Sequence, residues 1–429
     1  MTFLLESRVY GVEPSDLRSK IALKSRNVKQ GACVFITEAE PIEFMSAFLA
    51  AEPLAAEIFL CDPKWGTSEW SQVMSLATPD VVLGEAPAYV HSSAELSRHP
   101  LQNSDRFIMI ATGGTSGRIK FARHTLATFS AAVAGFKEHF GVERINALGV
   151  LPLYHISGFM GWLRTVLSEG IYFPWSSKAL EYDDVPKLPS QDDGWFCSLV
   201  PTQLQRLTQS PVAVAWLKTF RTIFVGGGPA WSELLENAAQ QGLLLSVSYG
   251  MTETGAMIAA LKPAEFLSGA RNVGQPMPHA QVHLDDGRIV IRSRSLFKGY
   301  YPERHDIEEF VTEDLGKFDA QGRLEVLGRI DDVIITGGKK VSPLEVEAAL
   351  RSSGLLSDVC VIGLADPEWG QVVIAFYPVG SGPLEVEKLK HGLKSSLASY
   401  KFPKRWIPVR EWPRNAQGKL NRAKLRELI

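Results

Sequence analysis

The chain has 429 residues, 45% of them hydrophobic, and a formal net charge of −2. This length suits two or three domains, and the nearly neutral charge excludes a general attraction to nucleic acid or to an anionic membrane surface, so we expect small-molecule partners. The four cysteines form no C-x-x-C pair and no apolar run approaches the ~20 residues of a membrane span, which predicts a soluble, cytoplasmic protein without a zinc site or a disulfide framework.

Short β-like runs alternate with helical patterns through the first half of the chain. This alternation is typical of largely parallel sheets covered by helices, and it predicts the α/β class. The predicted strands are 32–37, 58–61, 81–83, 107–111, 147–151, 195–200, 222–225 and 243–247, and the predicted helices are 42–51, 158–167 and one that begins after Pro201.

The pattern changes after about Pro276. Between about 271 and 330, short strands separated by Asp-Gly, Gln-Gly and Pro turns predict an antiparallel, β-barrel-like subdomain. We therefore expect a large domain over 1–330 and a small α+β domain over 331–429. The elements predicted for the small domain are helices at 343–350 and 384–397 and strands at 359–363 and 372–379.

The strand at 107–111 leads into nine residues, Thr112 to Lys120, with the sequence Thr-Gly-Gly-Thr-Ser-Gly-Arg-Ile-Lys. Glycines allow positive φ angles and close approach of the backbone, while the hydroxyl groups and two cations supply donors to phosphate oxygens. A Walker A loop would need Gly-Lys followed by Ser or Thr where Arg118-Ile119-Lys120 stands, so a common P-loop is excluded. Alone, the segment is either a phosphate-binding loop or a polar surface turn.

Further polar residues suit nucleotide chemistry, and each has a structural alternative. His155 follows a strand and is either functional or a buried structural histidine. Glu253, just after the strand at 243–247, is either a ligand for Mg²⁺ on a bound triphosphate or part of a helix N-cap. Asp314, in a predicted turn, would accept hydrogens from ribose hydroxyls or cap that turn. Lys419, near the C-terminus, is either a functional cation or a solvated one.

Taken in this order, these segments resemble the core motifs of the adenylate-forming superfamily, which includes acyl- and aryl-CoA synthetases, luciferases and peptide-synthetase adenylation domains. The resemblance runs from about residue 100 to the end, and the joint match of five motifs favours the functional readings. It implies a mobile phosphate loop, an acyl adenylate formed from ATP with Mg²⁺, transfer of the acyl group to coenzyme A, and rotation of the small domain about a hinge at Asp331.

The resemblance also implies roles for individual residues. Lys419 would bridge the acyl carboxylate and the α-phosphate during adenylation, and Glu253 would be the Mg²⁺ ligand. The implied catalytic residues are Lys419, Thr252, Glu253 and His155; the implied nucleotide-binding residues are Thr112, Gly113, Gly114, Thr115, Ser116, Gly117, Lys120, Gly227, Gly228, Tyr249, Gly250, Asp314 and Arg329; the residues implied to line the tunnel for coenzyme A are Gly337 and Gly338.

Two features depart from the superfamily pattern. Gly113 stands where serine is usual and Ile119 where proline is usual, so we expect phosphate binding to depend more on Thr112, Thr115 and Ser116. The chain before this loop is also short, which indicates that the N-terminal part of the large domain is trimmed.

The segment after His155 offers no carboxylate to pair with a substrate ammonium, which argues against an α-amino acid. Residues 153–158 and 198–207 most resemble the o-succinylbenzoate-CoA ligases of menaquinone and phylloquinone biosynthesis. Their substrate keeps a second carboxylate, for which Arg206 is the first candidate and Arg164 the second, unless these are solvated surface cations. The remaining residues of the predicted substrate site are Ser157 and Gly226.

Three alternatives stay open from the sequence. The first is that the chain is another aryl- or medium-chain acyl-CoA ligase. The second is an adenylating enzyme that loads a carrier protein, and the third is a non-catalytic sensor that binds ATP or an acyl adenylate. The expected partners are a small carboxylic acid, ATP and coenzyme A, with no nucleic acid and no membrane span, in a monomer or homodimer.

Overall fold

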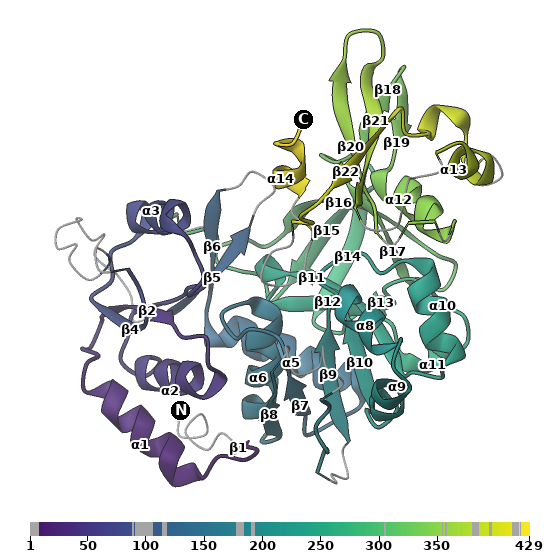
Figure 1. The fold of residues 1–429 in the computed structure, drawn as a ribbon. Helices are drawn as coiled ribbons and strands as arrows, with labels where there is room; N and C mark the ends of the chain where they lie inside the picture. The colour runs from purple at the N-terminus through teal and green to yellow at the C-terminus, as the bar shows by residue number, and fades with distance from the viewer. Residues whose placement is uncertain are drawn as a thin grey trace.

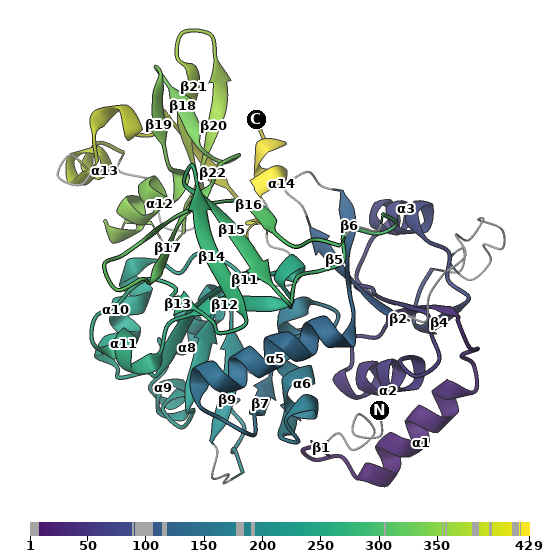
Figure 2. The same cartoon turned by 180° about the vertical axis from the view of Figure 1, so that it is seen from behind.

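The computed structural model describes residues 8–87, 90, 106–113, 118–176, 184–189, 194–303, 306–353, 355–356, 358–379, 386–393, 397–413, 420 and 422–429. The chain forms two mostly parallel sheets, an antiparallel sheet and a C-terminal mixed sheet (Figure 1; Figure 2). The predicted α/β class is therefore confirmed. Within these residues, none of the helices combines the length and the apolar character that a membrane crossing requires.

The N-terminal sheet has the strand order β4-β2-β3-β5-β6 and is parallel except for β6. Its interior strand β2 is buried along its whole length and is a nearly continuous apolar run, as expected for a strand covered on both faces. The strands are β2 (Cys33–Thr37), β3 (Glu57–Leu60), β4 (Val81–Gly84), β5 (Phe107–Gly113) and β6 (Ile119–His124), and the helices are α1 (Pro14–Ser25), α2 (Pro41–Ala51) and α3 (Thr67–Leu76).

The second sheet has the order β1-β8-β7-β9-β10-β11-β12-β13 and becomes antiparallel after β11. Its strands are β1 (Arg8–Val9), β7 (Asn146–Gly149), β8 (Ile171–Pro174), β9 (Trp195–Leu199), β10 (Thr222–Val225), β11 (Leu245–Met251), β12 (Ala256–Ala260) and β13 (Gln275–Pro276). Its helices are α5 (Leu126–Phe140), α6 (Ile156–Leu167), α8 (Pro201–Leu207), α9 (Pro211–Leu217), α10 (Ser232–Gln240) and α11 (Pro263–Leu267).

Helices α2, α5 and α6 share a core between these two sheets. Phe48 of α2 meets Trp162 of α6 with ring centroids 5.5 Å apart, and Phe129 of α5 meets Phe159 of α6 at 5.4 Å. All four side chains are fully buried. Because each aromatic ring removes a large apolar area from water, this layer holds the two sheets in a fixed relation.

The third sheet is antiparallel, with the order β14-β15-β16-β17, as predicted for about 271–330. It is open within the described residues, with β14 and β17 at its edges, and is therefore not a closed barrel. The turn predicted around Asp314 is wrong, because Asp314 lies inside β16 and pairs with Arg329 of β17. The strands are β14 (Ala280–Asp285), β15 (Arg288–Ser293), β16 (Phe310–Phe318) and β17 (Leu324–Arg329).

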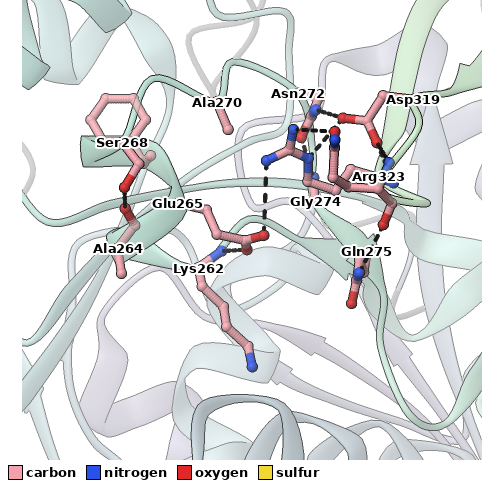
Figure 3. Close-up of polar contacts among 12 residues, drawn as sticks. Lys262, Ala264, Glu265, Ser268, Ala270, Asn272, Gly274, Gln275, Asp319 and Arg323 are labelled. Carbon is pink, nitrogen blue, oxygen red and sulfur yellow. Dashed lines mark hydrogen bonds and ion pairs between the residues drawn. The ribbon is translucent and has the colours of Figure 1, made fainter.

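A polar network fixes the β16–β17 hairpin to the segment that follows α11 (Figure 3). The Asp319 carboxylate accepts hydrogen bonds from Arg323 Nε at 2.7 Å and Asn272 Nδ2 at 3.0 Å, and Arg323 also lies 3.9 Å from Glu265 Oε1. The hairpin that carries the predicted ribose-binding residues is thus anchored to the second sheet at its far end.

The C-terminal sheet has the order β19-β18-β21-β20, and β22 pairs with β21. Its two apolar clusters consist only of residues between 334 and 425. Its strands are β18 (Ile334–Thr336), β19 (Lys339–Val341), β20 (Cys360–Asp366), β21 (Gly370–Pro378) and β22 (Arg405–Val409), and its helices are α12 (Pro343–Ser352), α13 (Val386–Leu393), the 3₁₀ turn Ser399–Lys401 and α14 (Arg422–Arg426).

A buried ion pair holds α14 against this sheet. Glu347 of α12 is 2% exposed, and its Oε1 accepts hydrogen bonds from Arg422 Nη2 at 2.7 Å and from the Val361 backbone N–H at 2.8 Å. Arg422 Nη1 donates to the Val361 carbonyl at 2.8 Å.

We predict that Glu347→Ala lowers the free energy of unfolding by about 3–5 kcal/mol, because it leaves the Arg422 charge without its carboxylate. Urea unfolding followed by tryptophan fluorescence measures this loss. Glu345→Ala, on the same helix, is the control: its side chain is 44% exposed and pairs with Lys401, so its cost is expected to stay below about 1 kcal/mol. Equal losses for the two variants would contradict the prediction.

Candidate active site

The candidate site lies where the N-terminal and second sheets meet the antiparallel sheet. The 3₁₀ turn Thr252–Thr254, directly after β11, packs against β5 and β6 of the N-terminal sheet. Tyr300, in the connection between β15 and β16, forms a bridge with Ala122 of β6. Segments far apart in the sequence therefore meet at the carboxyl ends of β5 and β11, the edge at which ligands bind in open α/β sheets.

The predicted phosphate loop is the connection of the β5–β6 hairpin. Thr112 pairs with Lys120, and Gly113 pairs with Ile119. Lys120 Nζ lies 5.0 Å from the centroid of the Tyr300 ring, a cation–π distance. Four of the predicted nucleotide-binding residues, Gly114, Thr115, Ser116 and Gly117, lie outside the described residues.

Ile119 has a structural role that proline could not fill. Its backbone N–H donates to Gln72 Oε1 of α3 at 3.0 Å, and proline has no N–H to give. Isoleucine at this position therefore allows a bond that fixes strand β6 of the hairpin to α3.

Glu253 is 7% exposed and lies in the 3₁₀ turn after β11. Its Oε1 accepts a hydrogen bond from the Tyr300 hydroxyl at 2.7 Å, and its backbone carbonyl accepts from the Phe297 N–H at 2.9 Å. Within the described residues Oε2 has no hydrogen-bond partner and no cluster of three or more potential ligands occurs. A single oriented carboxylate fits Mg²⁺, which in nucleotide sites binds one or two carboxylates, phosphate oxygens and water.

His124 fixes the backbone of the same turn from β6. Its Nε2 lies 2.7 Å from the Thr252 carbonyl oxygen and its Nδ1 3.0 Å from Thr128 Oγ1. Burial lowers the pKa of His124 from 6.5 to about 4, so the ring is neutral at pH 7, and the Nε2–H tautomer donates to Thr252. His124 thus couples the β5–β6 hairpin (the phosphate hairpin) to the turn that carries Glu253.

The predicted ribose site is assembled around Asp314. The Tyr249 hydroxyl donates to Asp314 Oδ2 at 2.6 Å, and Arg329 stands opposite Asp314 on the neighbouring strand. Burial, the larger effect, raises the pKa of Asp314, while the bond from Tyr249 acts against it. Arg329 holds the predicted hinge residue Asp331 through two bonds, Nε to Oδ1 at 2.8 Å and Nη2 to Oδ2 at 3.0 Å.

Glycine occupies the predicted positions for different physical reasons. A Cβ at Gly226 would lie 2.9 Å from Ser248 Oγ, so glycine allows β10 and β11 to approach closely at their carboxyl ends. Gly227 has φ +76°, and a Cβ at Gly228 would meet open space. A Cβ at Gly250 would lie 2.0 Å from the Ala256 carbonyl oxygen, so packing alone requires glycine there.

A cavity between α5, α6 and the second sheet contains Arg164, one of the two predicted substrate cations. The Arg164 side chain is 4% exposed, its guanidinium carbon lies 4.6 Å from the Phe136 ring, and burial lowers its pKa to about 10. Within the described residues, the guanidinium has neither a hydrogen bond nor an ion pair. The other lining residues include Ser157, Gly161, Phe196, Ser198 and Phe224.

Of the two predicted substrate cations, Arg164 lines the cavity and Arg206 does not. Arg206 lies on the exposed side of α8, whose buried residues are Pro201, Leu204 and Leu207, and it does not line the cavity. His155 is the N-cap residue of α6, two positions before the cavity residue Ser157.

The remaining predicted residues belong to the C-terminal part. Gly337 and Gly338 form the β18–β19 turn with φ +54° and +74°, and Gly337 N–H donates to the Trp369 carbonyl at 2.9 Å. Lys419 lies outside the described residues. Helix α14, which begins three positions later, lies between β6 and the C-terminal sheet in both views (Figure 1; Figure 2).

Residues 21–301 match the family described as AMP-binding enzyme, and residues 345–419 match the AMP-binding enzyme C-terminal domain. The chain belongs to the AMP-binding enzyme family. Among the similar AMP-binding enzymes, the 2-succinylbenzoate–CoA ligase of Bacillus licheniformis is 30% identical over 444 residues, which cover 94% of this chain and 91% of the relative.

Two solved structures of AMP-binding enzymes have the same fold. The o-succinylbenzoate CoA synthetase of Bacillus subtilis in complex with its acyl-adenylate intermediate has a TM-score of 0.78 and 24% identity, and covers 97% of this chain and 94% of that chain. The same enzyme with ATP and a magnesium ion has a TM-score of 0.77 and 24% identity, with 97% and 95% coverage.

We predict a pH-dependent contribution of His124 to stability. Its pKa is about 4 in the folded chain and near 6.5 when exposed, so its stabilising contribution is complete above pH 6.5 and is lost as pH falls toward 4. The difference in free energy of unfolding between the wild type and His124→Gln should shrink by about 3 kcal/mol between pH 7 and pH 4. Urea titrations at each pH measure it.

His283→Gln is the control for the chemical change itself: the His283 side chain is 52% exposed, so its substitution should change the free energy of unfolding at pH 7 by less than about 1 kcal/mol. A pH-independent effect of His124→Gln would contradict the prediction.

Proposed function

We propose that this AMP-binding enzyme is an ATP-dependent acid–CoA ligase that converts o-succinylbenzoate to o-succinylbenzoyl-CoA through an acyl adenylate, with release of pyrophosphate. This places it in menaquinone or phylloquinone biosynthesis. The similarity to 2-succinylbenzoate–CoA ligases along nearly the whole chain supports the reaction. Arg164 is the observation that carries the choice of acid.

Arg164 favours such an acid through electrostatics. A buried guanidinium without a carboxylate costs free energy, and an anionic ligand group that enters the cavity recovers part of that cost. The cavity walls are mostly aromatic and aliphatic, and Ser157 and Ser198 also line the cavity. An aromatic acid that keeps a second carboxylate complements this lining better than a benzoate or a fatty acid, which would leave Arg164 unpaired.

In the adenylation step, a carboxylate oxygen of the acid attacks the α-phosphorus of ATP, and the bond to the pyrophosphate oxygen breaks. Lys419 bridges the two reacting anions, and the phosphate hairpin with Thr112 and Lys120 binds the departing pyrophosphate. Mg²⁺, held by Glu253, neutralises phosphate charge when bound. Tyr300 orients the Glu253 carboxylate, and His124 fixes the turn that carries it.

Nucleotide orientation depends on the pair formed by Tyr249 and Asp314. The Asp314 carboxylate, already aligned by the Tyr249 hydroxyl, accepts hydrogens from the ribose hydroxyls, and Arg329 binds the same sugar from the neighbouring strand. Gly226, Gly227 and Gly228 leave room for the adenine and the acyl group beside β10. A preformed acceptor lowers the ordering cost of binding.

In the second step, the thiol sulfur of coenzyme A attacks the acyl carbonyl, the thiol proton leaves, and AMP departs. The two steps need different neighbours around one carbonyl, and rotation of residues 331–429 about Asp331 exchanges Lys419 for the turn at Gly337 and Gly338. We place the enzyme in the cytoplasm, as a monomer or homodimer; its four cysteines are buried free thiols, which suits a reducing compartment.

The substrate assignment predicts which acid supports pyrophosphate release. With ATP and Mg²⁺, release should be fastest with o-succinylbenzoate across a panel that includes benzoates, medium-chain fatty acids and α-amino acids. Turnover with benzoates or fatty acids but not with o-succinylbenzoate would contradict the assignment and leave the ligase class intact. Acyl transfer to free coenzyme A, but not to a carrier-protein thiol, is expected in the same assay.

Lys419→Ala should separate the two steps. We predict that it abolishes adenylation, because the reacting anions lose their bridging cation, while thioester formation from preformed acyl adenylate stays largely intact. Single-turnover assays of each half-reaction measure this. Equal loss of both half-reactions would contradict the rotation of the C-terminal part between the steps.

Arg164→Met tests the anion site in the cavity. Methionine keeps an apolar stem over Phe136 but removes the charge, so the KM for o-succinylbenzoate should rise about 10- to 100-fold, the worth of one charge-assisted hydrogen bond. Turnover with an unsubstituted benzoate should not fall. Arg206→Met is the matched control, and a larger rise in KM for that variant would place the second carboxylate at α8 instead.

A further inference from the structure

Three glycines line the cavity between α5, α6 and the second sheet: Gly149 at the end of β7, and Gly158 and Gly161 within α6. Packing requires two of them. A Cβ at Gly149 would overlap the hydroxyl group of Tyr172. A Cβ at Gly158 would overlap the carbonyl oxygen of Pro152. Neither position accepts a larger residue unless its neighbour moves.

No such contact explains Gly161. In the described part of the chain, apart from its chain neighbours and the nearby backbone of α6, no atom lies within 4 Å of the place that its Cβ would take. Gly161 lies in the middle of α6 and does not have a positive φ, so the backbone does not require glycine either. Glycine in a helix interior lowers stability relative to alanine, because it loses more conformational freedom on folding. The chain therefore keeps a destabilising residue where packing would accept alanine.

The open space at Gly161 borders Arg164. Ser157, Gly161 and Arg164 are four and three positions apart, so they share one face of α6, and all three line the cavity. Helical side chains lean toward the N-terminus of their own helix, so the stem of Arg164 extends past the turn that contains Gly161. A side chain at position 161 would therefore take up space beside the cation.

We propose that Gly161 is a specificity-determining residue: its missing side chain leaves the room in which the part of the acid that carries the second carboxylate lies beside Arg164. The inference rests on the proposed function, because it needs an acid that extends from the reacting carboxylate to Arg164. Arg164 supplies the charge that selects this acid, and Gly161 supplies the volume. A single methylene group in an apolar pocket changes the discrimination between two substrates by about 10- to 200-fold.

The test adds side-chain volume at this position with Gly161→Ala and Gly161→Leu. We expect kcat/KM for pyrophosphate release with o-succinylbenzoate to fall about tenfold in Gly161→Ala and about 100-fold in Gly161→Leu, because the added carbons occupy the space of the acid. With unsubstituted benzoate, which does not extend to Arg164, kcat/KM should stay within about twofold of wild type. The KM for ATP should also stay within about twofold, because the nucleotide does not enter this space.

Thermal unfolding is a second measurement, and a purely structural role of Gly161 would move it in the opposite direction. Gly161→Ala should raise the melting temperature by about 1–2 °C although it lowers activity, because alanine favours the helix and overlaps no neighbour. Gly158→Ala, in the same helix, is the matched control. Its Cβ would overlap the Pro152 carbonyl, so its melting temperature should fall.

Wild-type kcat/KM with o-succinylbenzoate in Gly161→Leu would overturn the inference. Equal losses with o-succinylbenzoate and with benzoate, or a lower melting temperature of Gly161→Ala, would overturn it as well, because each indicates that glycine serves the packing of α6. If the wild type does not turn over benzoate, the KM for ATP is the reference in its place. Should Gly161→Leu fail to fold, Gly161→Ala decides alone.

The acid panel separates this inference from the proposed function. If the wild type uses another extended acid instead of o-succinylbenzoate, only the assignment of the acid fails, and the variants are compared with that acid and with benzoate. A loss confined to the extended acid then supports the role of Gly161. Turnover with benzoate alone, or with no acid, would overturn both proposals.

Discussion

Adenylation brings a carboxylate into contact with a triphosphate, and the repulsion between these anions is the constraint around which the site is built. No single element supplies enough hydrogen-bond donors and cations to bind these anions. The groups of the candidate site therefore come from the β5–β6 hairpin, the turn after β11 and the antiparallel sheet. The contacts between these parts are polar and short: His124 to the Thr252 carbonyl, and Tyr300 to Glu253. The aromatic layer of α2, α5 and α6 keeps the two parallel sheets close enough for these contacts to form.

The acyl side of the site has the opposite electrostatic character. Arg164 is a buried cation with an aromatic ring beneath it and without a carboxylate partner in the described part of the chain. Such an arrangement is unfavourable in the free protein and becomes favourable when an anion enters. In the function that we propose, the same residue provides selectivity, because an acid without a second negative charge cannot compensate the buried guanidinium.

Much of the fold could be predicted from local pattern. Buried parallel strands such as Cys33–Thr37 are continuous apolar runs, and proline marks the start of α8 and α12, so these elements were found close to their observed bounds. Asp314 shows where prediction from local sequence pattern fails. Its neighbours Thr, Glu and Gly favour a turn, but pairing with β17 places it inside a bulged strand, which only tertiary contacts reveal.

The candidate site was predictable where its residues occur in motifs, as with Glu253, Tyr249 and Arg329. It was not predictable where a residue acts across a long sequence separation. Gln72, His124 and Tyr300 lie in segments without a motif, and each acts through a contact with a distant strand or turn. The sequence also does not report which face of a helix borders a cavity, so it could not show that Arg164 lines the cavity and Arg206 does not.

The most direct test of the account is the detection of the intermediate itself. The enzyme, ATP, Mg²⁺ and o-succinylbenzoate are mixed without coenzyme A, quenched within one turnover and examined by mass spectrometry. We expect o-succinylbenzoyl-AMP together with an equal amount of pyrophosphate. Formation of ADP and phosphate, or unchanged ATP in an enzyme that nevertheless forms the thioester when coenzyme A is added, would contradict it.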